Sequence, residues 1–227
     1  MNDLRIIPAG DAALVLELPS RIDPAVTARL VFIADSLRER AGTAVRDTVV
    51  GYCTLTVYFD PILTDASWLE EEMRAVASLR PPPAAFNRPR IDIPVCYGGD
   101  LGPDLAAVAE QIGATEDEVI DLHCTPEYRV FVVGFVPGFA YMGEVHPRLA
   151  LPRRSSPRTK VPAGSVAIAA GQTGIYPMET PGGWQLLGRT FIRPFDEARD
   201  PPVLFRPGDR VKFHAIGRAE YDLESAG

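Results

Sequence analysis

The residues of this chain with the clearest capacity for chemistry are arginines, and they gather in one segment. Between His146 and Arg193 the sequence has seven basic residues and a single acid, Glu179, so the segment has a net charge of +6. The whole chain of 227 residues has a net charge of −7, which leaves −13 for the remainder. A guanidinium group stays protonated and presents a planar fork of donors that fits a carboxylate or a phosphate. The segment therefore predicts a site for small anions.

The region from Gly134 to Arg193 is also rich in glycine, proline and aromatic residues. Glycines let the backbone approach a ligand or another chain, and prolines hold the loops between them rigid. Four ring residues are expected to wall a pocket or an interface in this region: Phe139, Tyr141, Tyr176 and Trp184. The alternative interpretation is a set of barrel corners with a few surface arginines.

Several motifs with known chemistry are absent from the sequence. A P-loop needs Gly-Lys-Ser/Thr, but Lys160 and Lys212, the two lysines, follow threonine and valine. Gly98-Gly99-Asp100 lacks the spacing of a dinucleotide-binding loop and predicts a tight turn. Ser165 lacks the second glycine of a nucleophile elbow, and we expect it to be a turn residue that leads into a strand.

The histidines do not predict a metal site. His123, His146 and His214 lack metal-type spacing, and His123 and Cys124 are adjacent, so we expect their side chains to point in different directions. His146 is expected in a loop, with a catalytic role as the alternative. Residues 104–123 could form a helix-turn-helix, but the acidic second helix excludes DNA recognition.

The first 80 residues predict a layer of two helices against one sheet. Strands are expected at 14–18, 45–50 and 54–59. Asp23-Pro24 is a helix N-terminus signal, and the apolar spacing continues to a stop at Gly42. A second helix follows, capped by Asp65 or Ser67. This arrangement is an α+β sandwich.

A proline-rich stretch at 80–89 predicts a linker, because three consecutive prolines cannot continue a helix. We expect domains at 1–83 and 84–227. In the second domain, 91–95 predicts a strand near a sheet edge because it contains proline. Two short helices follow, the second opening with a capping box at Thr115. Beyond Glu127, short apolar stretches between Gly/Pro turns predict a β-barrel or sandwich.

Composition excludes several classes of protein. The sequence is 46 % hydrophobic but has no apolar run near the ~20 residues of a membrane span, and no signal-peptide pattern. Three distant cysteines cannot form a disulfide framework, so a reducing, cytoplasmic location is expected. The net negative charge disfavours nucleic acids and anionic membranes as partners.

Five blocks of the Gly/Pro-rich region carry a resemblance to a known family. They are Pro-Gly-Phe-x-Tyr from Pro137, Pro-Arg-x-x-x-Pro-Arg from Pro152, Val-Pro-Ala-Gly-Ser-Val from Val161, Gln-Thr-Gly-Ile-Tyr-Pro from Gln172 and Pro-Gly-Gly-Trp-x-Leu-Leu-Gly-Arg-Thr from Pro181. In this order they resemble the allophanate hydrolase subunit 1 family, also called the KipI family or the family of 5-oxoprolinase B subunits. The resemblance implies an α+β N-terminal domain and a cyclophilin-like β-barrel C-terminal domain.

The resemblance also implies a function. The expected protein is the B subunit of an ATP-dependent 5-oxoprolinase, which cleaves 5-oxoproline to glutamate together with an A subunit and a C subunit of the allophanate hydrolase subunit 2 family. Because the sequence has no nucleotide-binding loop, ATP is expected on another subunit and the chain alone is expected to be inactive. No metal is expected.

The arginines then have a purpose, because the substrate carboxylate and a phosphorylated lactam oxygen are both anionic. The expected anion contacts are Arg153, Arg158 and Arg189, with Gln172 and Tyr176 as orienting groups. Glu179 is expected either to position water, as a catalytic group, or to pair with an arginine. The alternatives for the function are a KipI-like inhibitor of a sensor histidine kinase and a subunit of an allophanate or urea-type amidohydrolase. Prolyl isomerase activity is disfavoured, since fold alone does not confer function.

Overall fold

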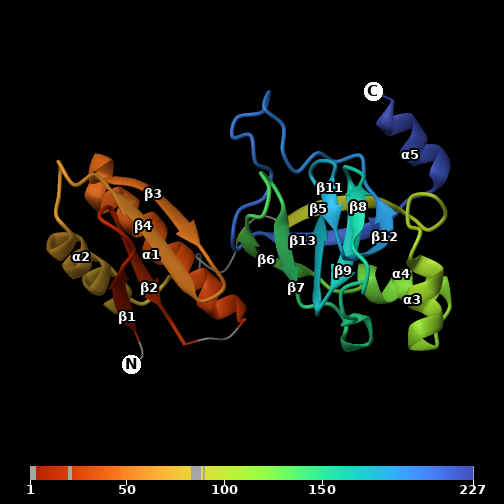
Figure 1. The fold of residues 1–227 in the computed structure, drawn as a ribbon, viewed down its shortest axis with the longest axis horizontal. Coiled ribbons are helices and arrows are strands. Elements are labelled where there is room, and N and C mark those ends of the chain that lie inside the picture. The colour runs from red at the N-terminus through yellow and green to blue at the C-terminus, as the bar shows by residue number, and fades with distance from the viewer. Residues whose placement is uncertain (1–3, 20–21, 83–87, 89, 227) are drawn as a thin grey trace. The chain divides into compact units, whose positions relative to one another are not determined.

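The structure, a computed structural model, describes residues 4–19, 22–82, 88 and 90–226. The chain forms two compact units, residues 1–88 and 89–227, and each is described by itself (Figure 1). The boundary predicted after residue 83 falls among residues 83–87, outside the described part of the chain.

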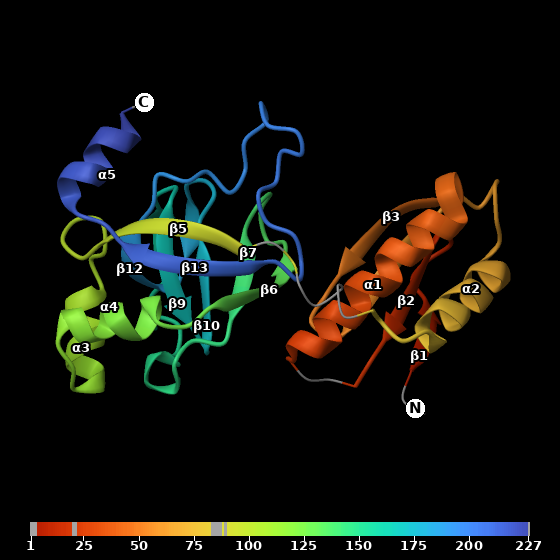
Figure 2. The ribbon, with the colours of Figure 1, turned by 180° about the vertical axis from the view of Figure 1, so that it is seen from behind.

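The first unit is an antiparallel sheet with two helices. Its strand order is β1-β2-β4-β3. Figure 2 shows both helices on one face of this sheet, where their apolar side chains share a core with the strands. The bounds are β1 Arg5–Pro8, β2 Ala13–Glu17, α1 Pro24–Ala41, β3 Val45–Val50, β4 Thr54–Phe59 and α2 Ala66–Ser78. The α+β prediction is confirmed for this unit.

Local signals in the sequence set the ends of these helices. The Asp23 carboxylate accepts a hydrogen bond from the Ala25 N–H, and α1 ends before Gly42. Asp65, one of the two predicted caps, accepts from the Trp68 N–H at 2.8 Å and begins α2. Side-chain oxygens at these positions satisfy amide groups that have no partner inside the helix.

The second unit is a closed seven-stranded barrel with the order β10-β7-β6-β13-β5-β12-β9. A two-stranded ribbon of β8 and β11 accompanies it. The strands are β5 Arg90–Tyr97, β6 Tyr128–Val133, β7 Ala140–Gly143, β8 Arg158–Val161, β9 Ser165–Ala169, β10 Gln172–Ile175, β11 Thr180–Gly182, β12 Gln185–Arg189 and β13 Arg210–Ala215. Of the two predicted architectures, barrel and sandwich, the structure has the barrel.

Strand β5 differs from the prediction of an edge strand, because it lies inside the closed barrel. It pairs in parallel with β13 over its first six residues, and Figure 2 shows the two strands side by side. It pairs with β12 only at Cys96 and Tyr97. Pro94 therefore lies where β5 is paired with β13 but not with β12. Because Pro94 has no N–H, it can be accommodated at a position with a partner strand on one side only.

Helices α3 (Leu105–Ile112), α4 (Glu116–Cys124) and α5 (Arg218–Ser225) complete the unit. The capping box predicted at Thr115 is present, with reciprocal bonds between Thr115 and Glu118. Gly113 ends α3 at a φ of 63°, in the left-handed region that glycine adopts without a Cβ penalty. None of the helices in the described ranges has the length and apolar character needed to cross a bilayer.

A polar chain runs through the barrel core around His123, which is fully buried. Thr173 donates to the Ala167 carbonyl at 3.0 Å, so its oxygen accepts from the Nε2–H of His123 at 2.8 Å. The Nδ1 of His123 is then the acceptor for the Tyr97 hydroxyl at 2.7 Å. Burial lowers the pKa of His123 to about 3, which keeps the ring neutral in this apolar environment.

The expectation that His123 and Cys124 point in different directions is wrong. The Cys124 Sγ lies 3.3 Å from the same Tyr97 hydroxyl that His123 contacts. Both residues lie in the last turn of α4, and Tyr97 lies close enough to reach both side chains.

Candidate functional site

The outer face of β9, β10 and neighbouring strands carries a second apolar cluster. Along β9, Val166 and Ile168 pack in the barrel core, whereas Ala167 and Ala169 belong to the outer cluster. This alternation follows from the two-residue period of a strand. Ala167 is opposite Gly174 on β10 and Leu186 on β12. The small side chains leave space on this face for large rings.

The rings predicted as a pocket wall or interface fill that space. Phe139 contacts three of them edge to face, with ring centroids 4.8 Å from Tyr141, 5.2 Å from Tyr176 and 5.5 Å from Trp184. Phe139 and Tyr176 are each 2 % exposed, and Trp184 is 5 % exposed. These three rings form a small core of their own, while Tyr141 stays half-buried and keeps contact with solvent.

Phe135 extends the ring cluster to the surface, and no pattern in the sequence singles it out. Its ring is exposed and meets Phe139 edge to face at 5.7 Å. Its φ is 74°, which is uncommon for a residue with a Cβ.

Tyr176 is held from several sides. A Cβ on Gly182 would overlap the Tyr176 hydroxyl, so the chain can pass this ring only because residue 182 is glycine. Burial is the main influence on the pKa of the Tyr176 hydroxyl, and the backbone amide of Trp184 acts against it. Burial raises the pKa of both Tyr176 and Tyr141, and the positive charge of Arg153 opposes that rise at each hydroxyl. Arg153 therefore lies near both tyrosines.

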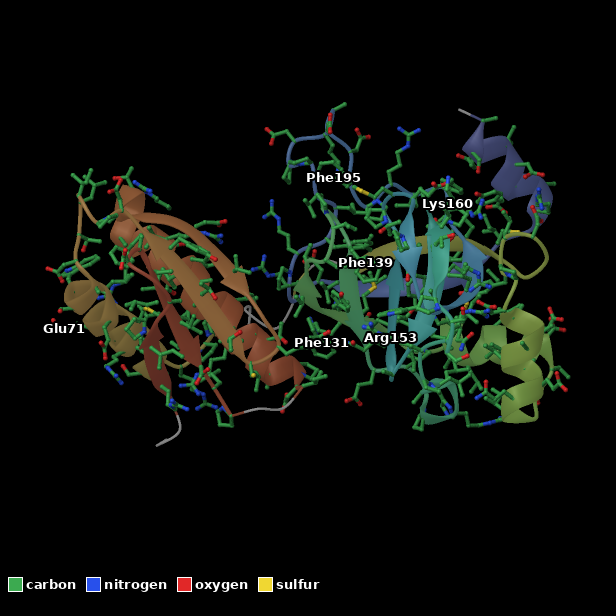
Figure 3. The ribbon with its side chains drawn as sticks, in the orientation of Figure 1. Glu71, Phe131, Phe139, Arg153, Lys160 and Phe195 are labelled. Atoms are coloured by element: carbon green, nitrogen blue, oxygen red, sulfur yellow. The ribbon has the colours of Figure 1, made fainter. Side chains whose placement is uncertain are left out.

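Arg153 is an exposed guanidinium on a fixed backbone (Figure 3). The residue before it, Pro152, accepts a hydrogen bond from the side chain of Gln185, and the N–H of Arg154 donates to the Gly183 carbonyl at 2.7 Å. Arg153 makes no ion pair with a carboxylate of the described residues. Its charge is available to an anion.

Arg158 is occupied by an acid that the sequence did not single out. Asp104 is 3 % exposed and accepts from Arg158 at 2.7 and 2.9 Å, from Arg154 at 2.8 Å and from the Leu186 N–H at 2.7 Å. Asp104 lies about 50 residues before these arginines, so the +6 segment is balanced in part by an acid outside it. The carboxylate ties α3, residues 154–158 and β12 together.

The other predicted site residues lie in different surroundings. Glu179 is exposed and forms an ion pair with Lys160 at 3.1 Å, a lysine rather than the expected arginine. Gln172 is half-buried on β10, opposite Ala169 and Gly143. Arg189 ends β12 and has a buried Nε. His146 begins a short 3-10 turn, where its Nδ1 accepts from the Arg148 N–H at 3.3 Å.

A separate cleft of ≈ 600 Å³ lies between β5, residues 191–204 and α5. None of the residues predicted for the substrate site lines it. Arg199, one of its charged residues, donates to four backbone carbonyls, those of Arg193, Pro194, Pro201 and Pro202. This arginine organises the loop.

The structure thus brings together Arg153, Tyr141 and Tyr176 on the outer face of the barrel. A guanidinium that no carboxylate of the described residues neutralises can hold a carboxylate or a phosphoryl oxygen through charge-assisted hydrogen bonds. Within the described ranges, no cluster of three His, Cys, Asp or Glu residues could hold a metal ion.

Comparison with known proteins gives consistent relationships. Residues 4–205 match the family model of the carboxyltransferase domain, subdomain C and D. The 5-oxoprolinase B subunit of Escherichia coli is 42 % identical over 94 % of this chain and 96 % of its own length. The proteins of the same name from Bacillus subtilis and Haemophilus influenzae are each 38 % identical, over 92 % and 99 % of their lengths.

Solved structures show the same fold. The protein TTHA0988 is 37 % identical, with a TM-score of 0.79 over 90 % of this chain. TTHA0988 is longer, and the match covers only 40 % of its length. A conserved uncharacterized protein from Pyrococcus horikoshii is 38 % identical and covered completely, with a TM-score of 0.58 over 96 % of this chain. The Kluyveromyces lactis urea carboxylase, at 18 % identity and a TM-score of 0.72 over 97 % of this chain and 22 % of its own, shares the fold. The chain therefore belongs to the carboxyltransferase subdomain C and D family and, within it, to the 5-oxoprolinase B subunits.

Proposed function

We propose that this chain is the B subunit of an ATP-dependent enzyme that hydrolyses 5-oxo-L-proline to L-glutamate. The observation that carries the proposal is the 38–42 % identity to three proteins named as 5-oxoprolinase B subunits over nearly their whole lengths. A protein named as a subunit works with partners, and we propose an A subunit and a C subunit of the allophanate hydrolase subunit 2 family. The barrel unit is proposed to be the cyclophilin-like domain of this complex, and the three free cysteines fit a reducing cytoplasm.

The proposed role of the outer-face site is to hold an anionic group of the substrate. An unactivated lactam is a poor electrophile, and transfer of a phosphoryl group from ATP to its carbonyl oxygen activates the ring carbon towards water. Water adds to that carbon, the ring C–N bond breaks as the nitrogen takes up a proton, and a second water hydrolyses the resulting acyl phosphate to glutamate and phosphate. Arg153 would hold the substrate carboxylate or the phosphorylated oxygen, since it is exposed and has no carboxylate partner among the described residues. Fixed donors of this kind stabilise developing negative charge without reorganising.

Arg158 and Glu179 have smaller parts in this proposal than the sequence predicted. Arg158 supports the site through Asp104, because its guanidinium is already bound by that carboxylate. Glu179 pairs with Lys160 at the surface. ATP is proposed to bind on another subunit, and the chain alone is proposed to be inactive.

Reconstitution tests the proposal. Purified A, B and C subunits are mixed with 5-oxo-L-proline and ATP, and glutamate release is followed with each of the three omitted in turn. Activity is expected only with all three, and full activity without this chain would refute the assignment. Allophanate and urea in place of 5-oxoproline, and a sensor kinase autophosphorylation assay, test the two alternatives directly.

The site itself is tested with Arg153→Gln in the reconstituted complex. Loss of one charge-assisted contact to the reacting substrate is expected to lower kcat/KM by about tenfold or more. Arg193→Gln is the matched control, because Arg193 is an exposed arginine of the same basic segment. Equal kcat/KM for wild type and Arg153→Gln would exclude Arg153 from substrate binding while leaving the assignment to the complex intact.

A further inference from the structure

Two buried polar atoms at one end of the barrel have no hydrogen-bond partner. They are the Oγ of Ser165 at the start of β9 and the Nε of Arg189 at the end of β12. Ser165 is completely buried. A buried donor without a partner costs about 1–3 kcal/mol, so its presence in a folded chain requires an explanation.

The two residues are direct neighbours across strands. Ser165 is the register partner of Arg189 in the antiparallel β9–β12 pair. Directly opposite residues on adjacent strands project to the same face, with Cβ atoms about 5 Å apart. Ser165 alternates with Val166 of the barrel core, so both side chains belong to the outer face. The two unpartnered donors thus lie side by side.

The backbone around this pair is tightly built. A Cβ on Gly164 would overlap the Thr190 carbonyl and lie 3.2 Å from the Cγ of Arg189. The Thr190 N–H donates to the Gly164 carbonyl at 2.9 Å. The turn before Ser165 is therefore packed directly against the end of β12, which fixes the relative positions of the two side chains.

The charge of Arg189 is not matched by an acid of its own. The pKa of Asp100 is lowered mainly by a hydrogen bond from Arg218 and also by the Coulomb attraction between Arg218 and Asp100. The positive charge of Arg189 makes only a smaller contribution to this lowering. Arg218 binds that carboxylate at 2.6 Å. Among the described residues, Arg189 forms no ion pair at contact distance. Arg189 is thus a partly exposed residue whose Nε is buried and has no hydrogen-bond partner.

We propose that Ser165 and Arg189 together bind one oxygen of a small oxyanion, a carboxylate or a phosphoryl group. The bound oxygen accepts from the Nε–H of Arg189 and from the hydroxyl of Ser165, and a second oxygen can accept from the outer nitrogen of the same guanidinium fork. Arginine presents these two parallel donors to planar or tetrahedral oxyanions. The site uses residues other than Arg153 and does not depend on the assignment to a 5-oxoprolinase.

Anion binding by the isolated full chain tests the site. Sodium phosphate and sodium acetate are titrated by calorimetry in a buffer without other oxyanions, and binding of either one identifies the class of ligand. Ser165→Ala is expected to weaken binding about tenfold, the effect of one hydrogen bond to a charged group. Arg189→Gln is expected to abolish binding, and Arg193→Gln to leave it unchanged.

Thermal unfolding separates a binding role from a structural one. In anion-free buffer Ser165→Ala is expected to raise the Tm, because it removes a buried hydroxyl without a partner. A higher Tm with unchanged affinity would overturn the proposal, as would wild type that binds neither anion. Loss of binding in Arg153→Gln but not in Arg189→Gln would also overturn it, since the anion would then occupy the other site. Arg189→Lys keeps the positive charge but lacks the two parallel donors of the guanidinium, so it is expected to bind the anion more weakly than wild type. This variant keeps the proposal testable if Arg189→Gln fails to fold.

Discussion

Acid is expected to destabilise the barrel unit through His123 at pH values where most carboxylates are still ionised. The pKa of this histidine is lowered by burial from 6.5 to about 3. Its ring lies within 4.7 Å of Phe213 by centroid, and both ring nitrogens have partners inside the core. In the unfolded chain the ring takes up a proton near its ordinary pKa, whereas in the folded chain it does not.

The sign and the size follow from this difference. A group with a lower pKa in the folded state stabilises fully above its unfolded pKa, and that stability is lost as the pH falls from 6.5 towards 3. Each pH unit inside the window costs up to about 1.4 kcal/mol. Between pH 7 and pH 5 the free energy of unfolding is therefore expected to fall by about 2 kcal/mol from His123 alone.

Urea unfolding at pH 7, 6 and 5 measures the effect, with Trp184 fluorescence as the probe of the barrel. Trp68→Phe removes the other tryptophan, which lies in the first unit on α2. His123→Gln cannot titrate and is expected to lose most of the pH dependence even though its stability at pH 7 is lower. Tyr97→Phe removes a partner but keeps the imidazole, so it should retain the pH dependence. An equal decline in wild type and His123→Gln would refute the reasoning.

Two further pairs of substitutions have expected outcomes that urea unfolding can check. Asp104→Asn removes a buried carboxylate that two arginines contact and is expected to lower the free energy of unfolding by about 3 kcal/mol. Glu179→Gln breaks an exposed ion pair and should lower it by less than about 1 kcal/mol. Similar losses of stability in the two variants would contradict this ranking. Gly182→Ala places a Cβ on the Tyr176 hydroxyl and is expected to cost about 1–3 kcal/mol. Gly217→Ala, in open space, should cost under about 1 kcal/mol, and a tolerated Gly182→Ala would show that the ring can move.

Much of the local structure could be predicted because its causes are local. Caps such as Asp23 and Thr115 act on amide groups two or three residues away, and the structure has both where they were expected. The strands at 45–50 and 54–59 have the predicted bounds, since β-branched and aromatic residues between turns are sufficient to define them. The arginine-rich segment and its ring residues were also visible, because they are contiguous in the chain.

The pairing of charges could not be predicted in the same way. Arg153, Arg154 and Arg158 are equivalent in the sequence, but Asp104 reaches only the last two. That carboxylate comes from the start of α3, and closure of the barrel brings it to residues 154–158. The adjacency argument for His123 and Cys124 failed for a related reason, because Tyr97 comes from β5, outside their helix.

The sequence by itself determined the caps, several of the strands, the family and the region in which anions are expected to bind. Tertiary structure decided which charged groups in that region are neutralised and which are available, and it placed Phe139, Tyr176 and Trp184 in a core rather than on a surface. The physical reason is range: capping and alternation act over a few residues, whereas burial and ion pairing depend on residues tens of positions apart that meet only when the barrel closes.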